Sequence, residues 1–85
     1  MSHYDNRSRR RTTRVQVEAD GYIWRVHGGR EGSRWHCHLV ELLGPLRLDG
    51  PVTQTVRDKI RAELAKALRL EESEIVRISA DLILA

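Results

Sequence analysis

The sequence predicts a single small α+β domain in which one helix packs against one sheet, in the order β-β-β-α-β. Three observations support this prediction. Apolar residues alternate with polar ones in three consecutive segments, turn-forming residues separate these segments, and a stretch rich in helix formers follows them. At 85 residues the chain has the size of one compact unit with a modest core. We expect residues 1–12 to form a disordered Arg-rich tail and residues 13–85 to form the domain.

The first two strands are predicted from the segment "RVQVEADGYIWRV", in which every second residue is apolar. The Asp20-Gly21 pair at its centre is a strong signal for a two-residue hairpin turn, because both positions must tolerate positive φ. A tight turn there places six apolar residues on one face, in the cross-strand pairs Ala19 with Tyr22, Val17 with Trp24, and Val15 with Val26.

The third strand begins after "GGREGS", residues 28–33, which we interpret as a glycine-rich hairpin loop. If His27 faces Arg34 across this loop, the large apolar residues again agree in their face. The predicted pairs are Val26 with Trp35, Trp24 with Cys37, and Tyr22 with Leu39. The result is a three-stranded antiparallel meander with one buried face.

The remainder of the chain predicts a loop, a helix and a final strand. Two prolines and two glycines mark residues 44–51 as a loop, with Pro51 suited to an early helical position. Residues 53–70 should form the helix, whose apolar stripe comprises Val56, Ile60, Leu64, Ala67 and Leu68. Residues 75–84 alternate and should form a strand that joins the sheet or pairs with a second copy of the chain; its apolar side comprises Val76, Ile78, Ala80, Leu82 and Leu84.

The opposite face of the meander should carry polar side chains from all three strands. Two cross-strand rows are expected on it, with Arg30 in the adjoining loop. The rows are Arg14, His27 and Arg34, then Gln16, Arg25 and His36, and the same face would also hold Glu18, Ile23 and His38. Arginine, glutamine and histidine have the donors needed to bind phosphates and base edges.

The chemistry of these side chains argues against an enzyme or a metal centre. His36 and Cys37 are adjacent on one strand, so they should point to opposite faces and cannot share a proton. Cys37 also cannot join His27, His36 and His38 in a tetrahedral zinc site, and it fits better as a small core residue. The loop "GGREGS" lacks the terminal Lys-Ser or Lys-Thr of a phosphate-binding loop. Tyr22, Trp24 and Trp35 fit the core better than a base-stacking platform, so we expect no cofactor and no metal.

Charge is concentrated at the N-terminus. The chain has a net charge of +3, yet residues 1–14 hold five arginines and one aspartate, whereas residues 15–85 hold ten basic and eleven acidic residues. Such a tail can either solubilise the protein or dock on phosphates or on acidic protein. The polar start and the lack of a long apolar run favour a cytoplasmic protein with no membrane contact.

A short part of the sequence resembles a known family of DNA-binding domains. An Arg-rich tail, then "DGYIWRVHGGREGSRW" and a helix, is similar to the arm-binding domains of phage tyrosine integrases over residues 7–70. The resemblance implies a three-stranded sheet that enters the major groove, with the helix packed behind it. Residues 75–84 depart from the family pattern, and no catalytic integrase domain follows.

Together these observations predict a non-enzymatic nucleic-acid-binding module. The tail arginines would contact phosphates and the sheet would set the docking geometry. The candidate binding residues are Arg9, Arg10, Arg11, Arg14, Arg25, His27, Arg30, Arg34 and His36. The alternative is a small phage-type protein that inhibits or adapts a host protein or nucleoprotein complex. In size and openness of its sheet the chain is similar to anti-CRISPR proteins, which share no sequence motif.

Overall fold

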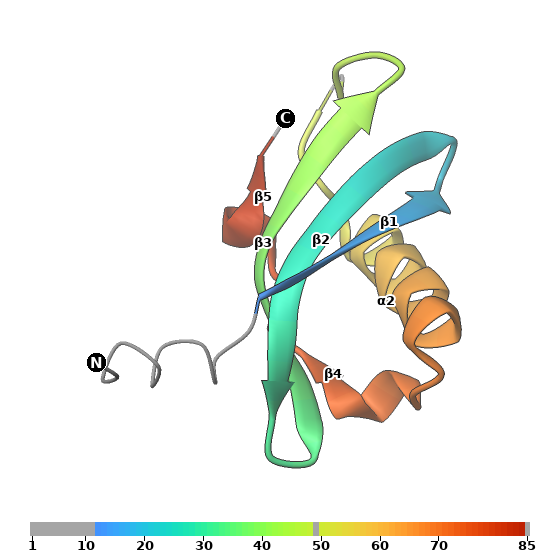
Figure 1. The fold of residues 1–85 in the computed structure, drawn as a ribbon. Coiled ribbons are helices and arrows are strands. Elements are labelled where there is room, and N and C mark those ends of the chain that lie inside the picture. The colour runs from blue at the N-terminus through green and yellow to red at the C-terminus, as the bar shows by residue number, and fades with distance from the viewer. Residues whose placement is uncertain (1–11, 49, 85) are drawn as a thin grey trace, which may run out of the picture.

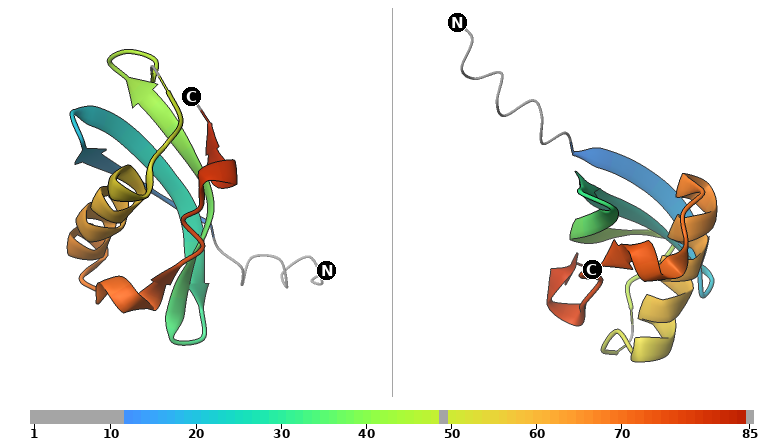
Figure 2. Two further views of the ribbon diagram at one scale, coloured as in Figure 1. Left: turned by 180° about the vertical axis from the view of Figure 1, so that it is seen from behind. Right: turned by 90° about the horizontal axis from the view of Figure 1, so that it is seen from below.

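The computed structural model describes residues 12–48 and 50–84 and confirms a small α+β domain (Figure 1). A mixed sheet curves around one side of the long helix, as both views in Figure 2 show. No helix within the described ranges is long and apolar enough to span a membrane. The elements are β1 (Thr13–Ala19), β2 (Tyr22–Glu31), β3 (Arg34–Gly44), α2 (Gln54–Leu68), the 3-10 turn η1 (Glu72–Glu74), β4 (Ile75–Val76), the 3-10 turn η2 (Ala80–Leu82) and β5 (Ile83–Leu84).

The first hairpin has the predicted register. Ala19 faces Tyr22, and the pairing continues without a shift to Thr13 opposite Gly28. Asp20 and Gly21 have positive φ angles of 57° and 82°, as the two central residues of a type I′ turn require. The local turn chemistry therefore determines this register.

The predicted register of the second hairpin is wrong. β2 continues through Gly28 and Gly29 to Glu31, and the turn consists of only Gly32 and Ser33. His27 consequently faces Leu39 and not Arg34. Gly28 has a packing role in the strand, because a Cβ at this position would lie 2.5 Å from ring carbons of Trp35, so only glycine allows this ring to pack there.

A β-bulge in β3 changes which residues face the core. The register shifts by one residue between His27 and Gly28, where His38 has no partner in β2. Beyond the bulge, Val40 faces Val26 and is fully buried. Leu39, predicted on the buried face, therefore lies on the other side of the sheet.

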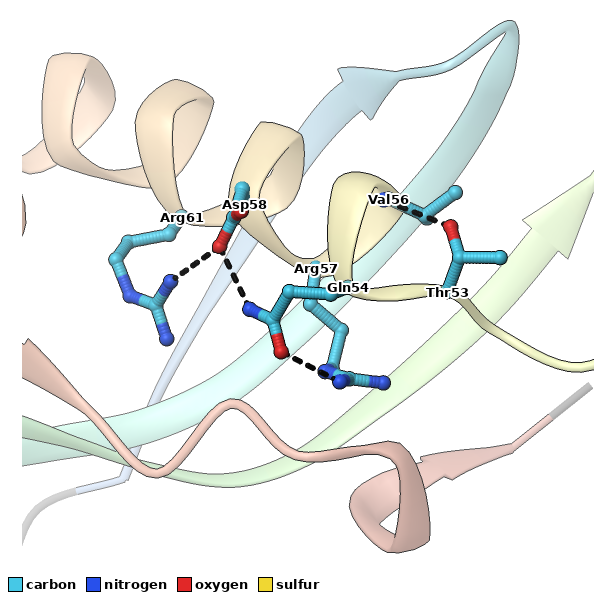
Figure 3. A network of polar contacts seen from close by, with 6 residues as sticks. All are labelled: Thr53, Gln54, Val56, Arg57, Asp58 and Arg61. Carbon is cyan, nitrogen blue, oxygen red and sulfur yellow. Dashed lines mark hydrogen bonds and ion pairs between the residues drawn. The ribbon is translucent and has the colours of Figure 1, made fainter.

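The helix begins one residue later than predicted and ends two residues earlier. Thr53 is its N-cap, with Oγ1 accepting a hydrogen bond of 3.2 Å from the backbone N–H of Val56 (Figure 3). Pro51 lies before this cap and is not part of the helix. Ala65 is buried in place of the predicted Ala67, which is exposed.

The predicted final strand is interrupted. β4 and β5 have two residues each, and both pair in parallel with β3 of the same chain. Arg77 has a positive φ of 73°, which breaks the extended backbone directly after β4. The predicted apolar face is wrong in part: Ile78 is buried as predicted, but Ile75 is buried as well, and Ala80 and Leu84 are exposed.

The core lies between the inner face of the sheet and α2. Trp24 is fully buried, and its indole Nε1 donates a 3.0 Å hydrogen bond to the backbone carbonyl of Ala19. The buried residues are Val17, Ala19, Trp24, Val26, Trp35, Cys37, Val40, Val56, Ile60, Leu64, Ala65, Ile75 and Ile78. Among the described residues that were predicted to bind a partner, all except Arg30 lie on the opposite side of the sheet.

Candidate binding surface

The surface of the sheet that faces away from α2 is called the outer face here. Its residues alternate with the buried ones along β1, β2 and β3, except at the bulge, where the consecutive residues His38 and Leu39 both lie on it, and β5 continues it beyond β3. The predicted placement of Cys37 and the histidines on opposite sides is confirmed. The outer-face residues are Arg14, Gln16, Glu18, Ile23, Arg25, His27, Arg34, His36, His38, Leu39, Glu41, Leu43 and Leu84.

A charged cluster occupies the centre of the outer face. His27 Nε2 donates a 2.7 Å hydrogen bond to Glu41 Oε1, and Arg25 Nη1 lies 3.7 Å from the same oxygen. Arg14 pairs with His27 on the neighbouring strand. The hydrogen bond from His27, aided by the charges of His27, Arg25 and Arg14, holds the pKa of Glu41 below its usual value of 4.5.

The two predicted cross-strand rows are corrected at their third position. Arg14 and His27 are neighbours as predicted, but Leu39 follows them in place of Arg34. Gln16 and Arg25 are likewise neighbours, but Glu41 follows them in place of His36. The longer β2 and the shorter turn move the start of β3 toward the tip of the hairpin, so the centre of the face contains a carboxylate.

The displaced basic residues lie together near the tip of the β2–β3 hairpin. Arg34 faces Glu31 beside the turn, His36 faces Gly29, and Arg30 faces Trp35. The arginines are exposed, and His38 Nε2 lies 3.8 Å from Glu31 Oε2. The tip therefore presents Arg34 on the outer face, with the two histidines behind it, whereas Arg30 lies on the inner side of the sheet, which it shares with Trp35.

The N-terminal end of the domain is close to this hairpin. Thr13, the first residue of β1, faces Gly28, where β2 continues past β1 toward the tip. Figure 1 shows β1 entering the sheet beside the middle of β2, above the hairpin tip. The candidate residues Arg9, Arg10 and Arg11 lie outside the described residues, but the segment that holds them joins β1 at this end.

Sequence reasoning missed Glu41 and an apolar part of the outer face. In the segment "LVELL", residues 39–43, Glu41 is the one charged residue among four apolar ones. A charged residue in such a strand favours the solvent-facing side, so the sequence did contain a signal for Glu41. Leu43 and Leu84 are 41% and 52% exposed, and they lie toward the end of β3 opposite the hairpin tip. The outer face therefore has a basic part at the tip and an apolar part at the other end.

The buried side chains provide no accessible chemistry on this face. Trp24 and Trp35 belong to the core as predicted, with no ring surface free to stack on a base. Cys37 is fully buried, and desolvation raises the pKa of its thiol to about 11. Within residues 12–48 and 50–84, no three His, Cys, Asp or Glu side chains gather as metal ligands would.

Comparisons with protein-family models, with curated proteins and with solved structures give no match for this chain. The resemblance to integrase arm-binding domains thus stays an expectation that derives from the residues.

Proposed function

We propose that this chain is a non-enzymatic binding module that engages nucleic acid through its N-terminal arm and the tip of the β2–β3 hairpin. One observation carries the proposal: the Arg-rich segment joins β1 toward the end of the sheet where the hairpin presents Arg34 on its outer face and Arg30 on its inner face. An arm and a basic hairpin at one end can contact one backbone together. The tip has a favourable shape, because a two-stranded ribbon fits the major groove.

The central cluster has a supporting role in this proposal. Glu41 already binds His27 and attracts Arg25, so these two side chains are held in place and partly neutralised. Arg14, Arg30, Arg34 and His36 have no ion pair within the described parts of the chain. We infer that they contact phosphates or base edges. Arg25 and His27 would instead stabilise the sheet surface through their contacts with Glu41.

The test is binding to labelled duplex DNA, single-stranded DNA and RNA across a salt series. Two variants probe the two parts of the site: Arg9, Arg10 and Arg11 all changed to Ala, and Arg30 and Arg34 both changed to Ala. Each lost phosphate contact should reduce the slope of log K against log salt by about 1. Arg47→Ala is the matched control, because Arg47 is an exposed arginine in the loop beyond the opposite end of β3.

Equal losses for Arg47→Ala and for the hairpin variant would contradict a defined site. Binding that depends only on the arm and disappears at moderate salt would reduce the interaction to nonspecific charge attraction. Binding to one nucleic acid that persists at physiological salt and needs both parts would support the proposal.

A second candidate function is binding to a protein, as expected of a small phage-type inhibitor or adaptor. The observation that favours it is the apolar part of the outer face, with Leu43 and Leu84 exposed beside Glu41. A protein partner retained from nuclease-treated lysate by the wild type, and lost by Leu43→Glu, would favour this function if free DNA and RNA do not bind. Retention that is unchanged in Leu43→Glu would count against it.

A further inference from the structure

The two edges of the sheet differ in how readily they can pair with another strand. On one side, β4 and β5 have two residues each and are interrupted by 3-10 turns, which makes a poor template for pairing. On the other side, β1 has seven residues, no proline, no bulge, and no strand beyond it among the described residues. Figure 2 shows β1 along the outside of the sheet, with α2 under its inner side.

The turn that begins β2 determines which backbone groups of β1 point outward. In a two-residue hairpin, the residues that flank the turn exchange hydrogen bonds, so Ala19 bonds to Tyr22. Because these bonds alternate along a strand, Thr13, Val15 and Val17 also direct their N–H and C=O groups to β2. The N–H and C=O groups directed to the free edge are those of Arg14, Gln16 and Glu18.

The sequence of β1, "TRVQVEA", is complementary to itself about Gln16. If two copies pair antiparallel with Gln16 opposite Gln16, then Arg14 faces Glu18 of the second copy, and Glu18 faces its Arg14. These are the residues whose backbone groups point to the edge, so hydrogen bonding and charge pairing select the same register. Val15 then faces Val17 on the inner side, where Val15 is only partly buried in the single chain.

We propose that a second copy of this chain pairs with the free edge of β1 in a two-fold homodimer centred on Gln16, forming one continuous sheet. The arrangement is isologous, because each copy presents the same edge to the other. Moving the centre to Val15 puts Arg14 opposite Gln16, and moving it to Val17 puts Gln16 opposite Glu18. Only the Gln16 register pairs opposite charges directly within β1. The inference does not require nucleic-acid binding, although Arg14 takes part in both proposals.

The first test compares the wild type with Gln16→Pro by sedimentation equilibrium up to millimolar concentration. Proline removes an N–H that points to the edge, so all pairing with β2 is retained. Gln16→Thr is the matched control, since it keeps the N–H and suits a strand. We expect dimers for the wild type and for Gln16→Thr, and monomers for Gln16→Pro with an unchanged circular dichroism spectrum. A monomeric wild type, or a dimeric Gln16→Pro, would overturn the proposal.

The second test addresses the register through charge reversal at exposed positions. Arg14→Glu places Glu opposite Glu, and Glu18→Arg places Arg opposite Arg, so each variant alone should raise the dimer dissociation constant about tenfold or more. A mixture of the two variants restores both opposite-charge pairs, and it should form a heterodimer with roughly wild-type affinity. Single variants that dimerise as tightly as the wild type, or a mixture that fails to form the heterodimer, would exclude the Gln16 register.

Discussion

His27 and Glu41 meet at 2.7 Å on the outer face, although fourteen positions separate them in the sequence. Glu41 pairs with Arg25 across β2 and β3, so its contact with His27 is diagonal. The bulge at His38 is responsible, because it turns Glu41 outward and Leu39 into the position opposite His27. This bulge, one of two register shifts between β2 and β3, thus places a carboxylate among the basic residues of the face.

This contact predicts how the stability of the protein depends on pH. The folded-state pKa of Glu41 is lowered, so its ionised form adds stability above the usual glutamate value of 4.5. That contribution is lost as the pH falls through the folded-state pKa. We expect Glu41→Gln to lower the thermal unfolding midpoint at pH 7 and to differ less from the wild type at strongly acidic pH.

The control for this measurement is Glu72→Gln, which neutralises an exposed glutamate with no ion pair among the described residues. Its midpoint should stay close to that of the wild type across the same pH range. If Glu41→Gln and the wild type differ equally at pH 7 and in strong acid, the ionised Glu41 does not stabilise the fold.

Gly28→Ala should destabilise the domain by roughly 1–3 kcal/mol, a range typical of overpacked cores. The added methyl group would lie 2.5 Å from ring carbons of Trp35 and would also press on the backbone carbonyl of His36. Urea unfolding measures the loss. Gly50→Ala is the matched control, because nothing lies within 4 Å of a Cβ at that position. Equal free energies of unfolding for the two variants would show that Trp35 does not pack against Gly28.

Cys37 should react slowly with thiol reagents in the native protein. It is the single cysteine of the chain, it is fully buried, and the pKa of its thiol is raised to about 11 from 9.0. A shift of this size lowers the thiolate fraction about 100-fold near pH 8, and burial slows access further. Labelling in urea provides the unfolded reference. Native labelling at the unfolded rate would place Cys37 outside the core.

Thr53→Ala should cost about 1 kcal/mol, because it removes the side-chain cap of α2. The hydroxyl of Thr53 accepts from the backbone N–H of Val56, and Gln54, Arg57 and Asp58 add exposed contacts around the same turn (Figure 3). Thr55→Ala, at an exposed position inside the helix, is the control and should change the free energy of unfolding little or increase it slightly. Equal losses for the two variants would show that the cap contributes nothing specific.

For the residues near the hairpin tip, the sequence predicted correctly on which face of the sheet each side chain lies. Near the tip, the true register differs from the predicted one by an even number of positions, so His36 and Arg34 stay on the outer face and Trp35 on the inner one. Their neighbours could not be predicted, because the glycine-rich segment looked like a loop. Gly28 and Gly29 form part of β2, and the Trp35 ring packs over Gly28, a contact that no local pattern encodes.

The sequence by itself determined the first hairpin, the helix and the α+β class. These features depend on interactions over a few residues: a turn of Asp20 and Gly21, a cap at Thr53, and an apolar stripe along α2. Tertiary structure decided the register of β3, the bulge at His38 and the division of the last segment into β4 and β5. These three features bury apolar side chains from elements that are distant in sequence. They depend on how those side chains pack together in the core, which the local sequence does not specify.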